Sequence, residues 1–321
     1  MQNFAVYGPV DQDLLKVEQT IRGTKEVQFP WLSELLGHIL EKSGKRIRPA
    51  LTLLAGRFYS YDLTTLVPMA AAVELLHTAT LVHDDTIDKA FLRRGTPTVN
   101  SLWDGSVAVL VGDYLFANSA EMVSRTMNVR VMREFALTLM SICMGEMSQD
   151  FHAFSRRQNR DNYLQRIGKK TASLFSMATE TGAVLSGAPE EVVLALKLYG
   201  YNLGMAFQIT DDILDFTGEA EEMGKPVGSD LLQGTLTMPA IIYIEKCPNG
   251  NPILEFLQDS KDTTSLDRAL EAVISSGSVE EAHQVANGFS RAALESLAIL
   301  PNTAERDILQ QLAEYNLVRR S

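Results

Sequence analysis

Residues 64–88, TTLVPMAAAVELLHTATLVHDDTID, are the stretch that decides the fold prediction. Apolar side chains dominate it, and three aspartates, Asp84, Asp85 and Asp88, stand at its end. Apolar residues that recur over this length without strict alternation are typical of a buried helix rather than of a strand. The stretch therefore predicts a long core helix whose last turn is acidic.

Helical periodicity recurs in the rest of the chain. We expect further helices over residues 26–43, 48–58, 106–127, 131–154, 162–185 and 189–215. No alternating segment flanked by Asn-Gly or Asp-Gly marks a β-hairpin. The pattern therefore predicts an all-α fold.

The length of 321 residues fits one domain or two. The clearest loop signal is CPNGNP at residues 247–252, and no linker is long or of low complexity. We therefore expect a single helical domain over residues 1–321, with its motifs within residues 44–243 and C-terminal helices over about residues 252–321.

The composition bounds the function. Hydrophobic residues make up 45% and charged residues 21% of the chain, as in ordinary globular proteins. Lys and Arg number 29 against 40 Asp and Glu, which gives a formal net charge of -11. A general nucleic-acid binder needs the opposite balance and is excluded.

The cysteines and the first residues bear on the location of the protein. Cys143 and Cys247 lack metal-ligand spacing, so we interpret them as buried thiols in a reducing compartment. Residues 1–15 lack the basic and apolar regions of a signal peptide, and no apolar stretch runs uninterrupted for the ~18 residues of a membrane span. We expect a cytoplasmic, soluble protein, and transient contact with a membrane surface stays open.

Two clusters of carboxylates carry the clearest chemistry. The pattern DDxxD occurs twice on apolar helices, as Asp84, Asp85 and Asp88 and again as Asp211, Asp212 and Asp215. Positions i and i+4 share one helix face, where like charges repel unless something neutralises them. Carboxylates with substrate phosphates suit Mg²⁺. One such cluster alone would also fit a solvated helix end, whereas two favour a metal site.

Basic residues accompany both clusters. They are Lys45, Arg46, Arg48, Arg93, Arg94, Lys169, Lys170 and Lys225. Lys169-Lys170-Thr171 is predicted to open a helical stretch, where backbone N–H groups and side chains hold an anion together. Taken singly, each of these residues would fit a solvated surface charge. Their placement around the aspartates favours diphosphate binding.

Four segments together carry a resemblance to a known family. They are GKRIRP (44–49), ELLHTATLVHDDTIDKAFLRRGTPTVN (74–100), FQITDDILDFTG (207–218) and GKPVGSDLLQGTLTMP (224–239). In this order and spacing they resemble the all-trans polyprenyl diphosphate synthases, which are head-to-tail prenyltransferases. The resemblance implies about a dozen mostly antiparallel helices around a central cavity, the isoprenoid synthase type, and usually a homodimer.

The resemblance also implies the reaction and the residues that perform it. An allylic diphosphate ionises with Mg²⁺, and the double bond of isopentenyl diphosphate attacks the cation. Since no side chain near the clusters is an obvious base, we expect the released diphosphate to accept the proton. Metal ligation is assigned to Asp84, Asp88 and Asp211, supported by Asp85, Asp212 and Asp215. The allylic diphosphate is assigned to Arg93, Lys170, Thr171 and Lys225, and isopentenyl diphosphate to Lys45, Arg48, His77 and Arg94. Thr171 and Gln208 line the reaction centre, and Phe207 lies near the alkene.

Two positions depart from the family pattern. Ser43 stands where a second glycine is common before GKR, and Thr235 stands where many members have lysine. The first bears on the geometry of a turn and the second on one phosphate contact. His77 and His83 would also fit packed helix histidines.

Small residues before the first cluster bear on product length. Ala79 and Thr80 lie one turn before Asp84, and Leu76 lies a turn deeper. Four residues span ~6 Å of helix, comparable to one isoprene unit. A tunnel left open there predicts a product longer than farnesyl and geranylgeranyl. Met122, Met140 and Met144 fit ordinary core methionines better than a tunnel floor.

Three other functions remain open. A short-chain farnesyl or geranylgeranyl diphosphate synthase would share these motifs. A class I terpene cyclase would not need GKRIRP, and a partner subunit of a heteromeric synthase would tend to lose the second cluster.

Overall fold

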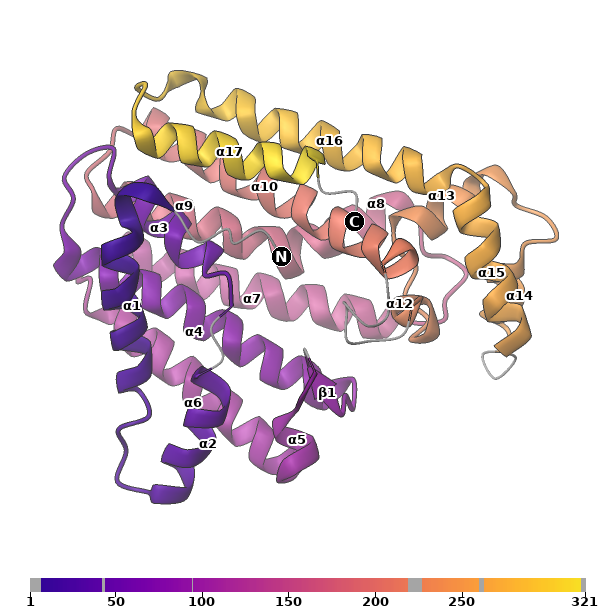
Figure 1. Ribbon diagram of the computed structural model, residues 1–321, viewed down its shortest axis with the longest axis horizontal. Helices are drawn as coiled ribbons and strands as arrows, with labels where there is room; N and C mark the ends of the chain where they lie inside the picture. The colour runs from indigo at the N-terminus through magenta and orange to yellow at the C-terminus, as the bar shows by residue number, and fades with distance from the viewer. Residues whose placement is uncertain (1–6, 42–43, 94, 219–226, 260–262, 319–321) are drawn as a thin grey trace. The chain divides into compact units, whose positions relative to one another are not determined.

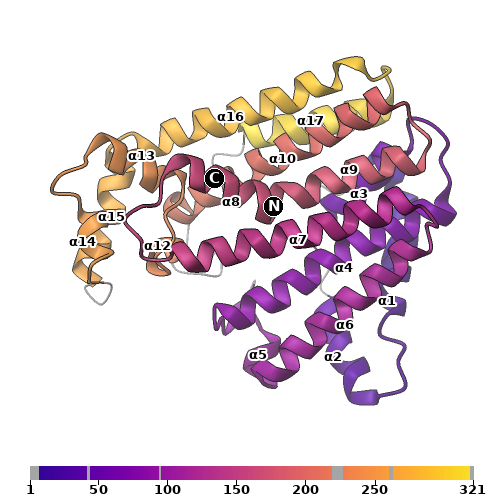
Figure 2. The same ribbon diagram turned by 180° about the vertical axis from the view of Figure 1, so that it is seen from behind.

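The computed structural model describes residues 7–41, 44–93, 95–218, 227–259 and 263–318 (Figures 1 and 2). Helices make up almost all of the ordered elements in these residues. In chain order they are η1 (Gly8–Val10), α1 (Asp11–Gly23), α2 (Pro30–Leu40), α3 (Ile47–Gly56), α4 (Leu63–Ile87), α5 (Val99–Leu102), α6 (Gly105–Ser124), α7 (Val129–His152), α8 (Arg160–Ile167), the π-helical turn η2 (Gly168–Ala172), α9 (Ser173–Leu185), α10 (Glu190–Thr217), α12 (Ser229–Leu232), α13 (Met238–Lys246), α14 (Pro252–Phe256), α15 (Thr263–Ser275), α16 (Ser278–Ser296), η3 (Leu297–Ile299) and α17 (Ala304–Val318). The all-α prediction is confirmed.

One short hairpin was not predicted. Strands β1 (Leu92–Arg93) and β2 (Thr96–Pro97) pair antiparallel, with Leu92 opposite Pro97. Two-residue strands are too short to show alternation, so only Gly95, which has a φ of 73°, signals the turn. The hairpin directly follows the first acidic cluster.

The chain folds into two compact units. The first comprises Met1–Leu137, Leu174–Gly200 and Leu297–Gln310, and the second comprises Thr138–Ser173, Tyr201–Ser296 and Gln311–Ser321. The first cluster and GKRIRP belong to the first unit. The second cluster and the Lys169–Thr171 segment belong to the second.

Helix α4 is the central element of the first unit and lies beside α6 (Figures 1 and 2). Asp62 caps it by accepting a hydrogen bond from the Thr64 backbone N–H at 2.9 Å. Residues 69–76 are all buried, which is why this stretch shows no polar face. The prediction of a long core helix over 64–88 is confirmed.

Among the residues that the structure describes, two helices, α4 and α10, are long and apolar enough to cross a membrane by length and composition alone. Most of the apolar window of each is buried within the fold. Core helices of globular proteins pass the same test, so this finding is weak support for a membrane span.

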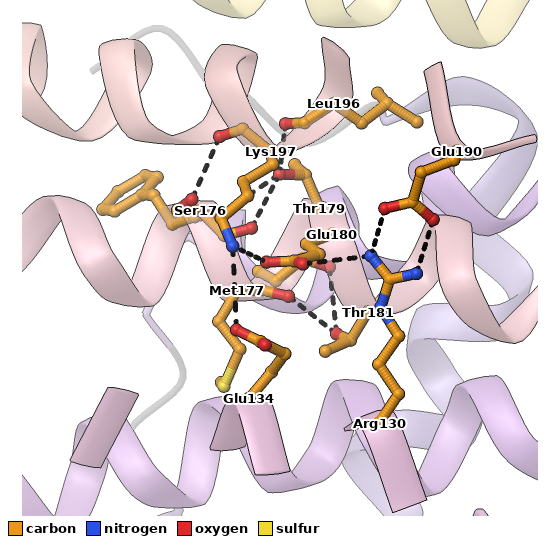
Figure 3. A network of polar contacts seen from close by, with 12 residues as sticks. Arg130, Glu134, Ser176, Met177, Thr179, Glu180, Thr181, Glu190, Leu196 and Lys197 are labelled. Atoms are coloured by element: carbon orange, nitrogen blue, oxygen red, sulfur yellow. Dashed lines mark hydrogen bonds and ion pairs between the residues drawn. The ribbon is translucent and has the colours of Figure 1, made fainter. Parts of the chain in front are cut away.

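An ionic network around one buried carboxylate joins α7, α9 and α10 in the first unit (Figure 3). The almost fully buried Glu180 lies 2.8 Å from the Lys197 ammonium and 3.5 Å from the Arg130 guanidinium. Arg130 also binds Glu190 through two hydrogen bonds of 2.6 and 2.8 Å. A carboxylate buried between two cations keeps its charge compensated, so the network fixes the register of these helix ends.

The second unit has its own apolar core. Residues of α10, α13, α14, α15 and α16 pack together there, including Phe216, Ile241, Phe256 and Ala282. Asn251, from the predicted loop signal, caps α14 by accepting from the Ile253 N–H at 2.9 Å. The loop prediction at 247–252 is thus confirmed.

Some predictions of burial were wrong. Cys143 and Cys247 are exposed, because Cys143 lies on the outward face of α7 and Cys247 ends α13. Met122 is buried as expected, but Met140 and Met144 are exposed on the same face of α7 as Cys143.

Gly182 lets α9 approach α3 closely in the first unit. A Cβ at this position would lie 2.2 Å from the backbone oxygen of Thr52, which cannot move independently of its helix. The helices therefore pack at a distance that only glycine permits.

We expect Gly182→Ala to lower the free energy of unfolding by about 1 to 3 kcal/mol, because overpacking forces α9 away from α3. The matched control is Gly288→Ala in α16, where an added Cβ meets no atom within 4 Å. That change should stabilise by about 0.5 to 1 kcal/mol through helix propensity. Urea unfolding measures both, and equal effects would contradict the packing argument.

Candidate active site

The first cluster ends α4 as the sequence predicts. Helix α4 ends at Ile87, and Asp88 is its C-cap residue, with its N–H donating to the Asp84 carbonyl at 2.8 Å. Asp88 is exposed, Asp84 is half-buried and Asp85 is buried. The three aspartates therefore differ in environment although they share one motif.

Asp85 is held inside the protein by Arg93. The Arg93 Nε atom lies 2.8 and 2.9 Å from the two Asp85 carboxylate oxygens. Burial raises the pKa of the Asp85 carboxyl, and the Arg93 charge opposes that shift. Arg93, predicted to hold the allylic diphosphate, is thus anchored to the cluster through its middle aspartate.

The two histidines of α4 occupy different settings. The His83 Nε2 atom lies 3.1 Å from the Val109 carbonyl and 3.6 Å from the Asp113 carboxylate, and its ring packs edge-on against Phe116. This confirms His83 as a packed helix histidine. His77 is half-buried, and its carbonyl accepts from the Thr80 hydroxyl at 2.7 Å.

The three basic residues of GKRIRP divide between structural and accessible roles. Arg46 has a left-handed backbone with a φ of 50° and binds Glu74 at 2.6 Å and Glu18, which ties α1 to α4. Lys45 is exposed, and the Arg48 guanidinium lies 4.5 Å from the centre of the Phe175 ring. Arg46, which was not assigned to a substrate, therefore carries the ion pairs that tie α1 to α4.

The residues predicted to set product length lie on α4. Leu76 and Ala79 are fully buried, and Thr80 is half-buried. Ala79 thus faces the core of the first unit, one turn before Asp84.

Lys170 and Thr171 lie on the π-helical turn in the second unit. The Lys170 ammonium pairs with the Glu146 carboxylate and lies 3.4 Å from the Gln149 side-chain oxygen. π-Turns in helices occur often at functional sites. The prediction that this segment opens a helix was wrong, because the chain is helical from Arg160 to Leu185 and the N–H groups of Lys169–Thr171 lie inside it.

The π-turn packs closely on α7. A Cβ at Gly145 would lie 2.7 Å from the Lys170 backbone nitrogen and 2.9 Å from its Cβ. Only glycine permits this approach, so α7 supports the turn from directly behind.

Asp212 of the second cluster is buried and doubly hydrogen-bonded. Its carboxylate accepts from the Tyr163 hydroxyl at 2.6 Å and from the Gln208 amide at 2.7 Å. Burial, and then the nearby Asp230 charge, raise the pKa of Asp212 to about 7, while both donors oppose the shift. Gln208 in turn accepts from the Thr171 hydroxyl at 2.7 Å, so the two residues predicted to line the reaction centre are in contact.

Asp215 is also fully buried, whereas Asp211 and Phe207 are half-buried. The Asp215 carboxylate accepts from the Ser229 hydroxyl at 2.7 Å and from the Asp230 N–H at 3.1 Å. It thereby fastens α12 to the end of α10. Thr235, expected to stand in place of a lysine of the family pattern, is buried, and its N–H donates to the Asp230 carbonyl.

Three positions of the prediction, Ser43, Arg94 and Lys225, lie outside the described residues. The sequence analysis missed Glu146, Gln149 and Tyr163. Their only signal was spacing, since Glu146 and Gln149 share a face of α7 and Tyr163 lies two helical turns before Lys170.

The accessible carboxylates fit a divalent cation shared with a phosphate ligand. Among the described residues, no three His, Cys, Asp or Glu side chains gather into a metal-binding group. Mg²⁺ commonly takes only one or two carboxylates and completes its shell with phosphate and water. Asp84 and Asp88, one helical turn apart at the end of α4, offer two such carboxylates in the first unit, and Asp211 offers one in the second unit.

The chain is similar to known proteins over most of its length. The family model described as Polyprenyl synthetase matches residues 29–273. A relative from Geobacillus stearothermophilus, named heptaprenyl diphosphate synthase component 2, is 39% identical over 97% of both chains.

Solved structures agree with this match. Heptaprenyl diphosphate synthase from Staphylococcus aureus superposes with a TM-score of 0.93 at 34% identity, over 98% of this chain and 100% of that one. A polyprenyl synthase from Caulobacter crescentus CB15, complexed with calcium and isoprenyl diphosphate, gives a TM-score of 0.91 at 33% identity, over 97% and 96%.

We expect Gly145→Ala to slow turnover by about ten- to a hundredfold, because it displaces the Lys170 backbone and with it Thr171. Steady-state kinetics would measure the loss, with Gly288→Ala as the control that keeps wild-type rates. A Gly145→Ala protein with full activity would show that the π-turn is not part of the active site.

Proposed function

Because this chain belongs to the polyprenyl synthetase family and is a trans-polyprenyl diphosphate synthase, we propose that it extends an allylic primer beyond geranylgeranyl diphosphate, using isopentenyl diphosphate and Mg²⁺. The observation that carries the proposal is the small, buried Ala79 one turn before the first cluster. The relatives named as heptaprenyl synthases support the same length class.

The proposed metal is Mg²⁺. The family uses a divalent cation with diphosphate substrates, and the Caulobacter crescentus structure contains calcium. Asp84 and Asp88 of the first unit and Asp211 of the second would act as its ligands, since these three are less buried than the other aspartates of the motifs. When bound, Mg²⁺ neutralises charge on the departing diphosphate.

The chain's own residues bind and orient the substrates in this proposal. Arg93 and Lys170 donate to the allylic diphosphate, and their carboxylate partners Asp85 and Glu146 keep both cations in place beforehand. Lys45, Arg48 and His77 bind isopentenyl diphosphate. Thr171 and Gln208 present oxygen atoms to the allylic carbon as its charge becomes positive.

The proposed assembly is a homodimer. Helix α6 exposes Leu110, and α7 exposes Met140, Met144 and Met147 at helical spacing. Exposed apolar rows of this kind mark association surfaces, and a second copy offers a matching row. The relative named as component 2 makes a heteromer the alternative. Light scattering of the purified chain tests the choice, and a monomer that is inactive alone would contradict the homodimer.

The proposed location is the cytoplasm, with brief membrane contact at product release. Two exposed cysteines without a disulfide fit a reducing compartment. Cell fractionation with a tagged chain tests the location.

We expect the purified chain, given Mg²⁺, labelled isopentenyl diphosphate and each allylic primer in turn, to form a ladder of products longer than four isoprene units. Chromatography of the dephosphorylated products measures their length. A ladder that stops at three or four units would contradict the length class, and no incorporation would contradict autonomous activity.

We expect Ala79→Phe to shorten the product by one or more isoprene units, because an aromatic ring fills the path one turn below Asp84. The rate of the first condensation should change little, since the diphosphate sites are untouched. The same chromatography measures both quantities. Unchanged product length in a folded variant would refute the placement of the tunnel at Ala79.

A further inference from the structure

Four side chains of the second unit form a continuous hydrogen-bonded chain that ends at the predicted reaction centre. The Tyr163 hydroxyl donates to Asp212 Oδ2 at 2.6 Å, and Gln208 Nε2 donates to Asp212 Oδ1 at 2.7 Å. The Thr171 hydroxyl donates to Gln208 Oε1 at 2.7 Å. Tyr163 and Asp212 are 1% and 4% exposed, so water cannot replace these bonds.

The donor and acceptor atoms fix the direction of this series of hydrogen bonds. Both Asp212 oxygens accept, one from Tyr163 and one from Gln208, so the Gln208 amide turns its nitrogen toward Asp212. Its oxygen then points to Thr171. Tyr163 occupies the second carboxylate oxygen, and burial raises the pKa of its hydroxyl well above the usual value, so the hydroxyl keeps its proton.

Helix geometry separates Asp212 from the accessible aspartate beside it. Gln208 and Asp212 are four residues apart and share one face of α10, whereas Asp211 is turned by about 100° to a neighbouring face. Asp211 is half-buried and Asp212 is buried, in agreement with this difference. The adjacent aspartates of one motif thus lie in different environments.

Tyr163, at the end of the hydrogen-bonded series remote from Thr171, is anchored in the second unit. The Arg166 guanidinium lies 5.4 Å from the centre of the Tyr163 ring and donates to the Leu236 carbonyl at 2.9 Å. These contacts tie the Tyr163 ring and helix α8 to other residues of the second unit. The Gln208 amide is then the group in the hydrogen-bonded series whose orientation depends on Asp212.

We propose that Asp212 and Tyr163 are positioning residues that lock the Gln208 amide with its oxygen toward Thr171, and that Asp212 does not ligate the metal ion. The role rests on the proposed prenyl transfer. The oxygen end of the amide dipole stabilises positive charge on an allylic carbon, whereas the nitrogen end opposes it. The orientation of one amide thus sets the rate of ionisation.

The first test compares two buried tyrosines. Tyr163→Phe removes the hydroxyl from the chain, and Tyr199→Phe removes an equally buried hydroxyl that donates to the Leu309 carbonyl at 2.7 Å in the first unit. Tyr163→Phe should lower kcat about tenfold with both KM values unchanged, while Tyr199→Phe keeps the wild-type kcat. Equal kcat values for the two variants would overturn the proposal.

The second test inverts the amide. In Asp212→Asn the oxygen at position 212 still accepts from Tyr163, and the new nitrogen faces Gln208. The Gln208 amide must then rotate by 180° and present its nitrogen to Thr171. We expect kcat to fall by about a hundredfold at an unchanged half-saturating Mg²⁺ concentration. A higher Mg²⁺ requirement, with activity restored at saturating Mg²⁺, would make Asp212 a metal ligand and overturn the proposal.

A double variant that exchanges the amide and the carboxylate between positions 208 and 212 should restore activity. Combining Asp212→Asn with Gln208→Glu gives the new nitrogen at 212 a carboxylate oxygen to donate to and leaves the second oxygen for Thr171. The net charge of the pair is unchanged. We expect the double variant to recover at least tenfold in kcat over Asp212→Asn alone. A double variant as slow as the single one would overturn the proposal.

A measurement without turnover separates this inference from the proposed function. Urea unfolding of the wild type, Tyr163→Phe, Asp212→Asn and their combination gives a double-mutant cycle. Non-additive losses in the free energy of unfolding show that Tyr163 and Asp212 are energetically coupled, even if the wild type makes no prenyl product. Additive losses would overturn the positioning role while leaving the synthase activity intact.

Discussion

The structure depends on how the charge of aspartates is compensated at the ends of apolar helices. A buried carboxylate is costly unless hydrogen-bond donors or a cation surround it. Asp85 has Arg93, Asp212 has Tyr163 and Gln208, and Asp215 has Ser229 and the Asp230 N–H. Each compensating contact also ties a second element to the helix, namely the hairpin, α8 and α12. Asp84, Asp88 and Asp211 are less buried, and they are the residues that we propose as ligands of Mg²⁺.

Much of the fold could be predicted from the sequence because burial imposes a period of 3.6 residues on a helix. Helices α3, α4, α6, α7 and α10 begin and end within a few residues of their predicted ranges. The hairpin at Leu92–Pro97, the π-turn at Gly168–Ala172 and the left-handed backbone of Arg46 could not be found this way. They arise from contacts between distant parts of the chain, to which a local pattern is blind.

The sequence predicted which residues belong to the candidate site, but it did not predict which of them are buried and which are accessible. Spacing identifies which aspartates share a helix face, but it does not say which face is buried. The motif therefore made Asp212 look like Asp211, although one is buried and the other half-buried. Tyr163 escaped detection because a single tyrosine in an amphipathic helix has no distinguishing pattern, and its role appears only from its contact with Asp212.

Asp215 also has a topological consequence. Its carbonyl accepts from the Gly228 N–H at 2.8 Å, and its carboxylate accepts from the Ser229 hydroxyl and the Asp230 N–H. One residue at the end of α10 therefore holds both the first turn of α12 and the residue before it. Loss of that carboxylate would release two contacts at once, whereas loss of the Ser229 hydroxyl would release one. The attachment of α12 thus depends on a single residue of the acidic motif.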